Sequence, residues 1–345
     1  MSRALLGLLG WLAALGLGFS PSVPEGSGRA LTSGAETETK TETRVQSVLE
    51  ALEASERVLW VGAHPDDETV AAGLLAWAKD VAGELYLVSL THGENGDRVW
   101  GGLCRGSQLG EARAALFAQS AEILQADGFE VGPFVNGPHA VEELDGRCPP
   151  GAPFRGWPPS ATSDDAIAKW RGEGDPLLYL VEVLRRWRPD AMVAMDAYCG
   201  VSGHPEHIAA ARLLLEAIPR AADPEAYPSA REAWAVRFGI FSAHVIRPLI
   251  ECGFCKCEGP PPQEPVEGVL TLEESRTHGA TYFRVACRVA KSYQNTMEER
   301  GRTPEELEAE CERAERSAQE AFRRGVRAHP IVERYRLYTG LSSRR

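Results

Sequence analysis

Residues 58–63 read VLWVGA, and residues 64–68, which follow directly, read HPDDE. The first string is a short, uninterrupted apolar run that ends at a turn, a pattern typical of a strand buried on both faces of a parallel sheet. A second run of this kind, LYLVSL, occupies residues 85–90. Between the two runs, residues 67–82 carry apolar side chains at helical spacing. This succession of strand, helix and strand predicts an α/β fold.

The same alternation continues along the chain. It predicts a doubly wound, Rossmann-like, mostly parallel sheet with helices on both faces. Further strands are expected at residues 129–135, 191–195 and 236–241, and further helices at residues 110–127, 176–187 and 206–218, the last of them ended by Pro219.

Three long segments interrupt this pattern and are rich in Gly, Pro and Cys: residues 91–109, 136–174 and 251–268. They exceed the ordinary length of connections, so we expect loop insertions that form the walls of a site. After residue 271 the pattern is helical again, and the highly charged residues 304–324 are expected to cover the outside of the domain. We predict one folded domain over residues 44–340.

The N-terminal segment has the pattern of an export signal. After Arg3, residues 4–19 form an uncharged run rich in Leu, Ala and Gly. The run is shorter than the roughly 20 residues that a spanning helix needs, which favours a secretory signal peptide over residues 1–20. Export to the periplasm or the extracellular space is therefore expected, and the alternative is a segment that stays uncleaved and anchors the chain in a membrane. Residues 21–43, poor in large apolar side chains, are predicted to be a disordered linker.

Composition narrows the class of protein. Hydrophobic residues make up 43% and charged residues 25% of the 345 residues, as in ordinary globular proteins. The formal net charge of −12 argues against nucleic acid as a partner, because phosphates would be repelled. In an exported chain the eight Cys are expected to form disulfides that pin the long loops. The alternative for Cys252, Cys255 and Cys257 is half of a structural zinc site.

Two short strings carry most of the chemistry, and each follows a predicted strand. The first contains His64 and Asp67, and the second, GHPEH at residues 203–207, contains His204 and His207. Carboxyl ends of parallel strands meet at one edge of the sheet, so these side chains are expected to lie together. Catalytic zinc sites take three ligands from His and carboxylate, and a spare carboxylate beside them can act as a base. The alternative is that each string caps a helix by itself.

Two more strings accompany AHPDDE and GHPEH: THGENG at residues 91–96 and KSYQ at residues 291–294. Together the four strings resemble the PIG-L/LmbE-like family of metal-dependent de-N-acetylases, which includes the glycosylphosphatidylinositol-pathway and mycothiol-pathway deacetylases. The resemblance spans about residues 57–295 and implies an LmbE-like fold. The long insertions are not accounted for by it.

Carried over position by position, the resemblance implies a role for each residue of the two strings. It implies that His64, Asp67 and His207 bind zinc, that Asp66 is the general base, and that His204 stabilises the oxyanion. Fe²⁺ or Co²⁺ could occupy the same set of ligands.

The sequence departs from the family in one respect and leaves other roles open. Some members have a Tyr two residues before the HPxH string, where this chain has Ser202, and its nearest Tyr is Tyr198. Asp196 either orients a ligand imidazole or is an ordinary turn residue at a strand end. Arg98 and Trp100 either contact a sugar substrate or lie on the surface.

The leading hypothesis is an exported zinc-dependent hydrolase that removes an N-acetyl group from an amino sugar or glycoconjugate by cleaving a linear amide C–N bond. Its partner is then a small molecule or glycan, and membrane contact is expected only if the N-terminal segment is uncleaved. One alternative is a metal-dependent amidase acting on a non-sugar N-acyl compound. The other is a non-catalytic secreted carbohydrate-binding protein.

Overall fold

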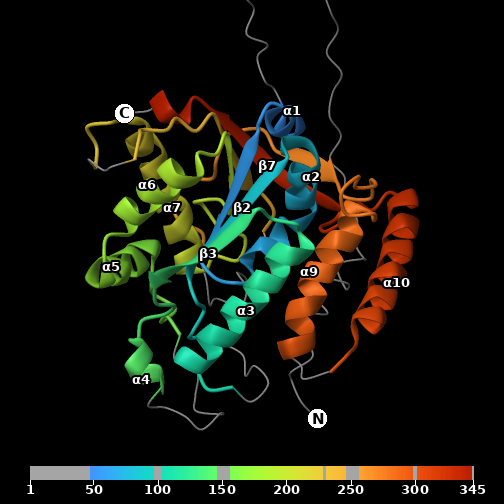
Figure 1. Cartoon of the computed structure of the whole chain (residues 1–345), viewed down its shortest axis with the longest axis horizontal. Coiled ribbons are helices and arrows are strands. Elements are labelled where there is room, and N and C mark those ends of the chain that lie inside the picture. The colour runs from blue at the N-terminus through green and yellow to red at the C-terminus, as the bar shows by residue number, and fades with distance from the viewer. Residues whose placement is uncertain are drawn as a thin grey trace, which may run out of the picture. The chain divides into compact units, whose positions relative to one another are not determined.

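The structure is a computed structural model that describes residues 47–96, 103–145, 156–227, 231–245, 256–297 and 301–343. A seven-stranded sheet in the order β3-β2-β1-β4-β5-β7-β6 runs through its centre (Figure 1). The strands are β1 (Arg57–Gly62), β2 (Glu84–Thr91), β3 (Gly128–Phe134), β4 (Ala191–Ala194), β5 (Phe238–Ser242), β6 (Glu267–Leu270) and β7 (Val332–Thr339). The helices are α1 (Val48–Glu53), α2 (Ala72–Ala82), α3 (Ser107–Ile123), α4 (Val141–Asp145), α5 (Ser163–Glu173), α6 (Pro176–Trp187), α7 (Pro205–Ala222), α9 (Tyr282–Met297) and α10 (Pro304–Arg323), with short 3₁₀ turns η3 (Asp67–Val70) and η4 (Leu341–Ser343).

The sheet is parallel except at one edge. β1 pairs in parallel with β2 and with β4, so that Val61 lies opposite Val88 on one side and Ala194 on the other. β3 and β5 extend this parallel part, whereas β7 and β6 are antiparallel. The predicted α/β class and mostly parallel sheet are confirmed. Strands β6 and β7 were not predicted, because β7 (VERYRLYT) mixes charged residues with apolar ones and contains no apolar run.

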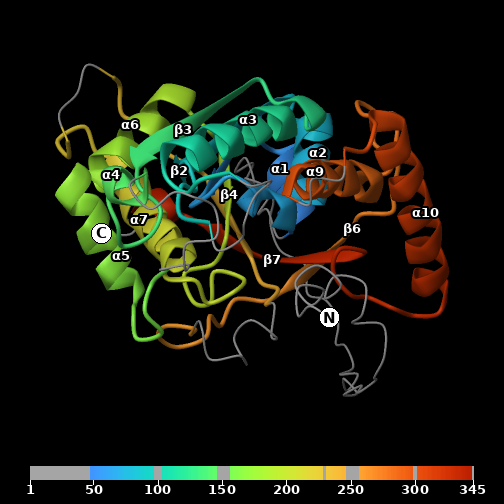
Figure 2. The same ribbon diagram turned by 90° about the horizontal axis from the view of Figure 1, so that it is seen from below.

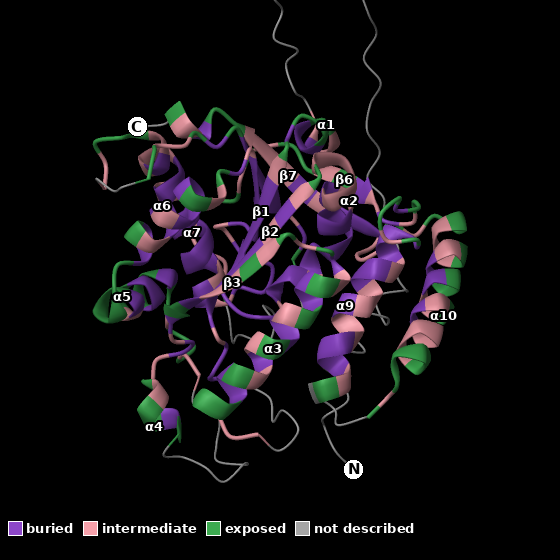
Figure 3. Cartoon of the chain, in the orientation of Figure 1, coloured by how far each residue is buried: buried purple, intermediate pink, exposed green. Residues whose placement is uncertain are grey.

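Different helices cover the two faces of the sheet. Helices α5, α6 and α7 lie on one side and α2, α3 and α9 on the other, as the two views show (Figures 1 and 2). Alternate residues of β1 serve both layers: Leu59 and Val61 belong to the core cluster under α6 and α7, while Val58 and Trp60 point the opposite way and are also fully buried. Helix α10 packs outside α9 and has exposed positions along its length (Figure 3).

Two predicted helices differ from the structure at one end: the helix expected at residues 67–82 begins later, and the helix expected at residues 206–218 ends later. Pro65 does not open an α-helix; the chain passes through Asp66, which has a left-handed backbone, into η3 before α2 begins. Pro205 opens α7, one residue before the start predicted for this helix. Pro219 does not stop that helix, which continues to Ala222. A proline this close to the helix end removes only one backbone hydrogen bond near the terminus, so the helix accommodates it.

The long segments are only partly loops. Residues 136–174 contain α4 and α5, and α5 begins with a capping box formed by Thr162 and Asp165. The predicted signal peptide (1–20) and linker (21–43) lie outside the described residues, as do Arg98 and Trp100. Among the described helices, none is both long and apolar enough to cross a bilayer.

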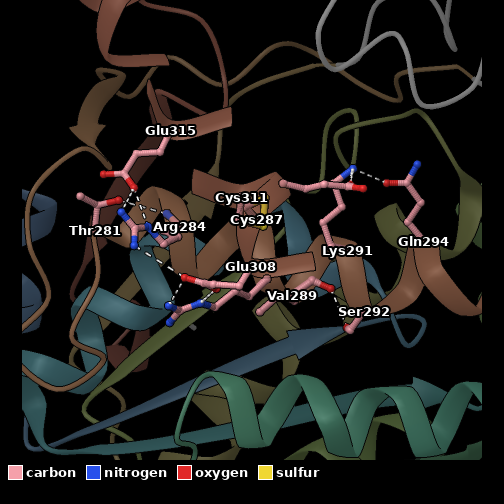
Figure 4. Close-up of a disulfide and its surroundings, with 12 residues drawn as sticks. Thr281, Arg284, Cys287, Val289, Lys291, Ser292, Gln294, Glu308, Cys311 and Glu315 are labelled. Atoms are coloured by element: carbon pink, nitrogen blue, oxygen red, sulfur yellow. Dashed lines mark hydrogen bonds and ion pairs between the residues drawn. A yellow bond between two sulfur atoms is a disulfide. The ribbon is translucent and has the colours of Figure 1, made fainter. Parts of the chain in front are cut away.

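Disulfides connect both loops and helices. The Cys199–Cys257 bond joins two loops, and Cys104 is also disulfide-bonded. Cys287–Cys311 instead joins helices α9 and α10 (Figure 4), so the expectation that the bridges pin loops is wrong for this pair. The alternative of a half zinc site fails at Cys257, whose sulfur is bonded to Cys199. Three further positions lie outside the described residues, namely Cys148, Cys252 and Cys255.

Candidate metal and catalytic site

The candidate site lies at the carboxyl ends of β3, β2, β1 and β4, which are neighbours in the sheet. The order of the strands reverses between β1 and β4, and ligands of doubly wound sheets bind at such a switch point. His64, Asp66 and Asp67 follow β1, while His204 and His207 lie at the start of α7, which follows β4. The three imidazole ring centres are 4.9, 5.1 and 5.1 Å apart. The structure thus brings together all five residues selected from the sequence, and their individual roles remain predictions.

Three possible ligand atoms converge at the centre of this group. His64 Nδ1 and His207 Nε2 are 3.2 Å apart. Asp67 Oδ1 lies 3.1 Å from His207 Nε2 and 3.6 Å from His64 Nδ1. Two ligand atoms bound tetrahedrally to one zinc ion at about 2.1 Å are about 3.4 Å apart. The separations therefore fit three ligands of a single metal ion.

Neighbouring groups orient Asp67 and His207 so that one atom of each remains free to bind a metal ion. Asp67 Oδ2 accepts the backbone N–H groups of Ala63 and His64 at 2.8 and 2.9 Å, which leaves Oδ1 toward the site. His207 Nδ1 donates to the Gly200 carbonyl at 3.0 Å, so that Nε2 carries the lone pair. A Cβ at Gly62 would lie 2.9 Å from Asp67 Cβ, and glycine is thus needed for this close approach.

Glu206 orients His64. Its side chain is fully buried, and Oε2 accepts from His64 Nε2 at 2.5 Å and from Asn136 Nδ2 at 2.5 Å. Oε1 accepts from the Gly137 N–H at 2.6 Å and from Trp157 Nε1 at 2.9 Å. A carboxylate that holds the distal nitrogen of a ligating His fixes its tautomer and makes the ligand more basic. Nδ1 is therefore the nitrogen of His64 that faces Asp67 and His207, and it becomes a ligand atom once it gives up its proton.

The carboxylates around His64 create a negative environment that favours a bound cation. Burial opposes protonation of His64, but the carboxylates of Asp67 and Glu206 outweigh it and raise the pKa of His64 to about 10. Burial opposes ionisation of the two acids as well. His207 and His64 nevertheless hold the pKa of Asp67 well below its usual range, and His64 above all lowers the pKa of Glu206 to about 2. The donor set and the charges both fit a divalent metal ion.

Asp66 has an unusual backbone and a dedicated partner. Its φ of 101° lies in the left-handed region, where a residue other than glycine is strained. Its Oδ1 pairs at 2.9 Å with Nη2 of Arg113, a guanidinium that also donates to the carbonyls of Pro65 and Gly93. Burial raises the pKa of Asp66, and Arg113 partly offsets the rise. The side chain of Asp66 remains 34% exposed, and the charges of Asp67, His64 and His207 act on it.

His204 differs from the other two histidines. It caps α7, and its Nδ1 accepts the Glu206 N–H at 3.3 Å. Burial and the neighbouring His207 and His64 lower the pKa of His204 to about 3, so the ring is neutral and carries its proton on Nε2. His64, His204 and His207 together also form a possible metal-binding trio. The protonated Nε2 favours hydrogen-bond donation by His204 over metal ligation.

The contacts also resolve the open role of Asp196. Its Oδ1 accepts the backbone N–H groups of Tyr198 and Cys199, which makes it a turn residue at the end of β4. Ser202, which stands where some family members have Tyr, lies 3.0 Å from His207 Nδ1 through its Oγ. Tyr293, from the KSYQ string, donates to Glu68 Oε1 at 2.7 Å.

Sequence reasoning assigned no role to Glu206, Asn136, Trp157 or Arg113. Asn136 directly follows the predicted strand at residues 129–135. Because sites of such sheets lie at the carboxyl ends of the strands, this position is a signal for Asn136. Glu206 lies within the GHPEH string, whose histidines alone indicate a metal site. No sequence signal marks Trp157 or Arg113, whose contacts arise from the packing of distant segments.

Fold and site together define a doubly wound α/β protein with a candidate metal site at the carboxyl edge of its sheet. Residues 59–218 match the family model described as "PIG-L: GlcNAc-PI de-N-acetylase", so the chain contains a PIG-L family domain. Both the AHPDDE and the GHPEH strings lie within the matched residues. The resemblance inferred from the sequence is confirmed.

Similar proteins include a 1D-myo-inositol 2-acetamido-2-deoxy-alpha-D-glucopyranoside deacetylase 1 of Frankia casuarinae, 33% identical over 52% of this chain and 56% of the relative. A deacetylase of the same description from Corynebacterium urealyticum is 32% identical over 52% of this chain and 53% of the relative. The chain thus spans about half the length of these curated relatives. Among solved structures, the N,N'-diacetylchitobiose deacetylase of Pyrococcus horikoshii is 18% identical, with a TM-score of 0.48 over 90% of this chain and 96% of that one.

Proposed function

We propose that this protein is a metal-dependent de-N-acetylase that hydrolyses the N-acetyl amide of an amino sugar or glycoconjugate. The observation that carries the proposal is the convergence of His64 Nδ1, Asp67 Oδ1 and His207 Nε2 within 3.1 to 3.6 Å of one another. Asp66 and His204 belong to the same group of residues but are held by other partners: Asp66 pairs with Arg113, and His204 accepts the Glu206 N–H. The PIG-L domain and relatives named as deacetylases of an acetamido sugar support the substrate class.

Zinc is the proposed metal, and Fe²⁺ or Co²⁺ would suit the same ligands. His64, Asp67 and His207 would hold it. When bound, such an ion lowers the pKa of a water ligand to about 7 and polarises a carbonyl oxygen. Zinc sites of catalytic type keep a position open for water beside three protein ligands, which agrees with a set of three ligand atoms.

The protein's own residues then carry the proton and support the developing charge. Asp66 accepts a proton from the attacking water as the water oxygen bonds to the acyl carbon. The Nε2–H of His204 donates to the oxygen that becomes negative, an interaction worth about 2.7–4 kcal/mol for one donor. The C–N bond breaks, the proton passes from Asp66 to the amine nitrogen, and acetate and a free amine leave.

The environment of Asp66 suits such a base. Its pKa is raised by burial, and a base whose pKa approaches the working pH transfers protons most effectively. The ion pair with Arg113 holds the carboxylate in one orientation. The strained backbone at φ 101° is typical of residues whose position is set by function.

The decisive experiment compares Asp66→Asn with the wild-type protein. Acetate release would be measured with N-acetylglucosamine and its oligomers, and metal content would be measured on the same samples. We expect a loss of activity of about 10²- to 10⁴-fold with one zinc per chain retained. Asp164→Asn, at a position whose side chain is 77% exposed, is the control and should behave as wild type. Near wild-type rates in the Asp66 variant would show that another group is the base.

The same assay separates the competing functions. Acetate release from N-acyl amino acids but not from sugars would indicate an amidase of a different substrate class. Sugar binding by the metal-loaded protein with no release from any N-acyl compound would indicate a carbohydrate-binding protein. No bound metal after reconstitution with zinc would overturn the proposal.

Export from the cytoplasm is part of the same proposal. The uncharged residues 4–19 support it, as does the presence of disulfides, which persist in oxidising compartments. N-terminal sequencing of the protein recovered from the medium or periplasm tests it. A start near residue 21 is expected, whereas an intact N-terminus in the membrane fraction would indicate an anchor.

A further inference from the structure

The loop that leads into α7 has an unusual backbone. Gly200, Val201 and Gly203 have φ values of 47, 65 and 74°, all in the left-handed region. Glycine adopts such values freely, but they are strained for Val201, which is β-branched and only 1% exposed. A loop of this kind persists only when its surroundings hold it in place.

The same loop sets the orientation of His207. The carbonyl of Gly200 accepts from His207 Nδ1 at 3.0 Å, and Ser202 Oγ lies 3.0 Å from the same nitrogen. A Cβ at Gly200 would be 2.6 Å from His207 Cβ, so the loop backbone packs directly against this side chain. A change in the loop would therefore turn the imidazole, and with it the Nε2 atom that faces His64 and Asp67.

A second segment clamps the loop from outside. The Cys199–Cys257 disulfide connects the start of the loop to residues 256–258. Two backbone hydrogen bonds flank it, from Lys256 N–H to the Gly203 carbonyl at 3.2 Å and from Glu258 N–H to the Tyr198 carbonyl at 2.7 Å. The clamp thus holds the loop at both ends.

The clamp is itself attached to the helical layer. Glu258 accepts from the backbone N–H and the hydroxyl of Ser163, at the first residue of α5, at 2.7 and 2.5 Å. Helix α5 packs against α7, the helix that carries His204 and His207. Residues 256–258 therefore connect the loop to a rigid part of the fold, and the disulfide is the covalent element of that connection.

From these contacts we infer that the Cys199–Cys257 disulfide is a positioning device for the metal site: it holds the strained 199–203 loop so that His207 presents Nε2 to the metal. The inference rests on the proposed function. It assigns to this disulfide a role that a generally stabilising cross-link would not have, namely control of metal affinity through the orientation of one ligand.

The second described disulfide provides a matched control. Cys287–Cys311 joins α9 to α10 and lies near the ion pair of Arg284 with Glu308 (Figure 4). Its two cysteines are 24 residues apart in the sequence, against 58 for Cys199–Cys257, and the helices that it joins carry none of the proposed metal ligands. Loss of either bond should lower stability, but only loss of the Cys199–Cys257 bond should lower the affinity for the metal.

The test compares full-length Cys199→Ser/Cys257→Ser, Cys287→Ser/Cys311→Ser and wild-type protein. Zinc affinity would be measured by competition with a chromogenic chelator, and hydrogen exchange of residues 197–207 would be followed in the metal-free proteins. We expect the first variant to lose about 10- to 100-fold in zinc affinity and to exchange faster in this loop, and the control to match wild type in both. Acetate release by the first variant should recover in excess zinc, because affinity and not the base is affected.

Equal zinc affinity in the two variants and wild type would overturn the positioning role while leaving the proposed function intact. Failure of the wild-type protein to bind zinc would overturn the proposed function, and the inference with it. Should the Ser pair not fold, Cys199→Ala/Cys257→Val keeps apolar contact without the covalent bond and takes its place under the same criteria.

Discussion

Replacement of Glu206 by Gln removes one charge from the interior of the site while keeping the size of the side chain. Glu206 accepts four donors: two at Oε2, from His64 and Asn136, and two at Oε1, from Gly137 and Trp157. A glutamine has one acceptor oxygen and one NH₂ group that only donates. In either orientation of the amide, the NH₂ group meets two of the four donors.

The cost follows from this count. Each buried donor left without an acceptor costs about 1–3 kcal/mol, so two of them predict a loss of about 2–6 kcal/mol in the free energy of unfolding of the metal-free protein. His64 can reduce the cost by giving up its Nε2 proton and keeping the one on Nδ1. Nδ1 is the atom that faces Asp67 and His207, and a proton there would block metal binding. Zinc affinity should therefore fall by about 10- to 100-fold.

The assay pairs zinc competition titration with urea unfolding of the metal-free protein. Glu94→Gln is the control: Glu94 is also buried and accepts the Asn136 N–H at 3.1 Å, but it does not bond His64. It should lose some stability and keep its zinc affinity. If Glu206→Gln bound zinc as tightly as wild type, the carboxylate would not be what orients His64.

In wild type, the lowered pKa of Glu206 contributes stability above the ordinary Glu pKa of about 4.5, and this stability is lost as the pH falls toward 2.

Three further changes probe the surroundings of the site. Arg113→Met should raise the pKa of Asp66 further, because the cation at 2.9 Å is lost. The acid limb of the pH profile of kcat/KM should then move to higher pH. An unmoved limb would contradict the role of the ion pair. Zinc must displace the proton of His64, whose pKa is about 10, so zinc affinity should rise about tenfold per pH unit in the neutral range, and pH-independent titrations would refute this. By the same raised pKa, metal-free protein has stability from His64 that is fully present below about pH 6.5 and lost as the pH rises toward 10. Tyr293→Phe deprives buried Glu68 of a donor at 2.7 Å and should cost about 1–3 kcal/mol in urea unfolding, while an unchanged midpoint would show that the bond contributes nothing.

Local patterns sufficed to predict most of the regular structure. Four of the five parallel strands, β1, β2, β4 and β5, are marked by apolar runs, because strands buried on both faces need apolar side chains at every position. The edge strand β3 (GFEVGPF) is only partly buried and its pattern is weaker. Helix α6 begins at Pro176 after the Asp175 cap, as its sequence indicated. β7 escaped prediction because Glu333 and its other charged residues break the apolar pattern. Buried Glu333 is accommodated because it accepts the N–H groups of Gly73 and Leu74 at the start of α2 and the hydroxyl of Tyr335.

The sequence by itself determined the α/β class and the two strings that meet at the site, because strand ends can be located from local hydrophobicity and parallel strands share one edge. The tertiary structure decided which atoms face one another. Glu206 meets Trp157 and Asn136 across 49 and 70 residues, and Cys199 meets Cys257 across 58. Such contacts depend on strand order and on the packing of α5 and α7, and no local pattern of hydrophobicity or spacing encodes them.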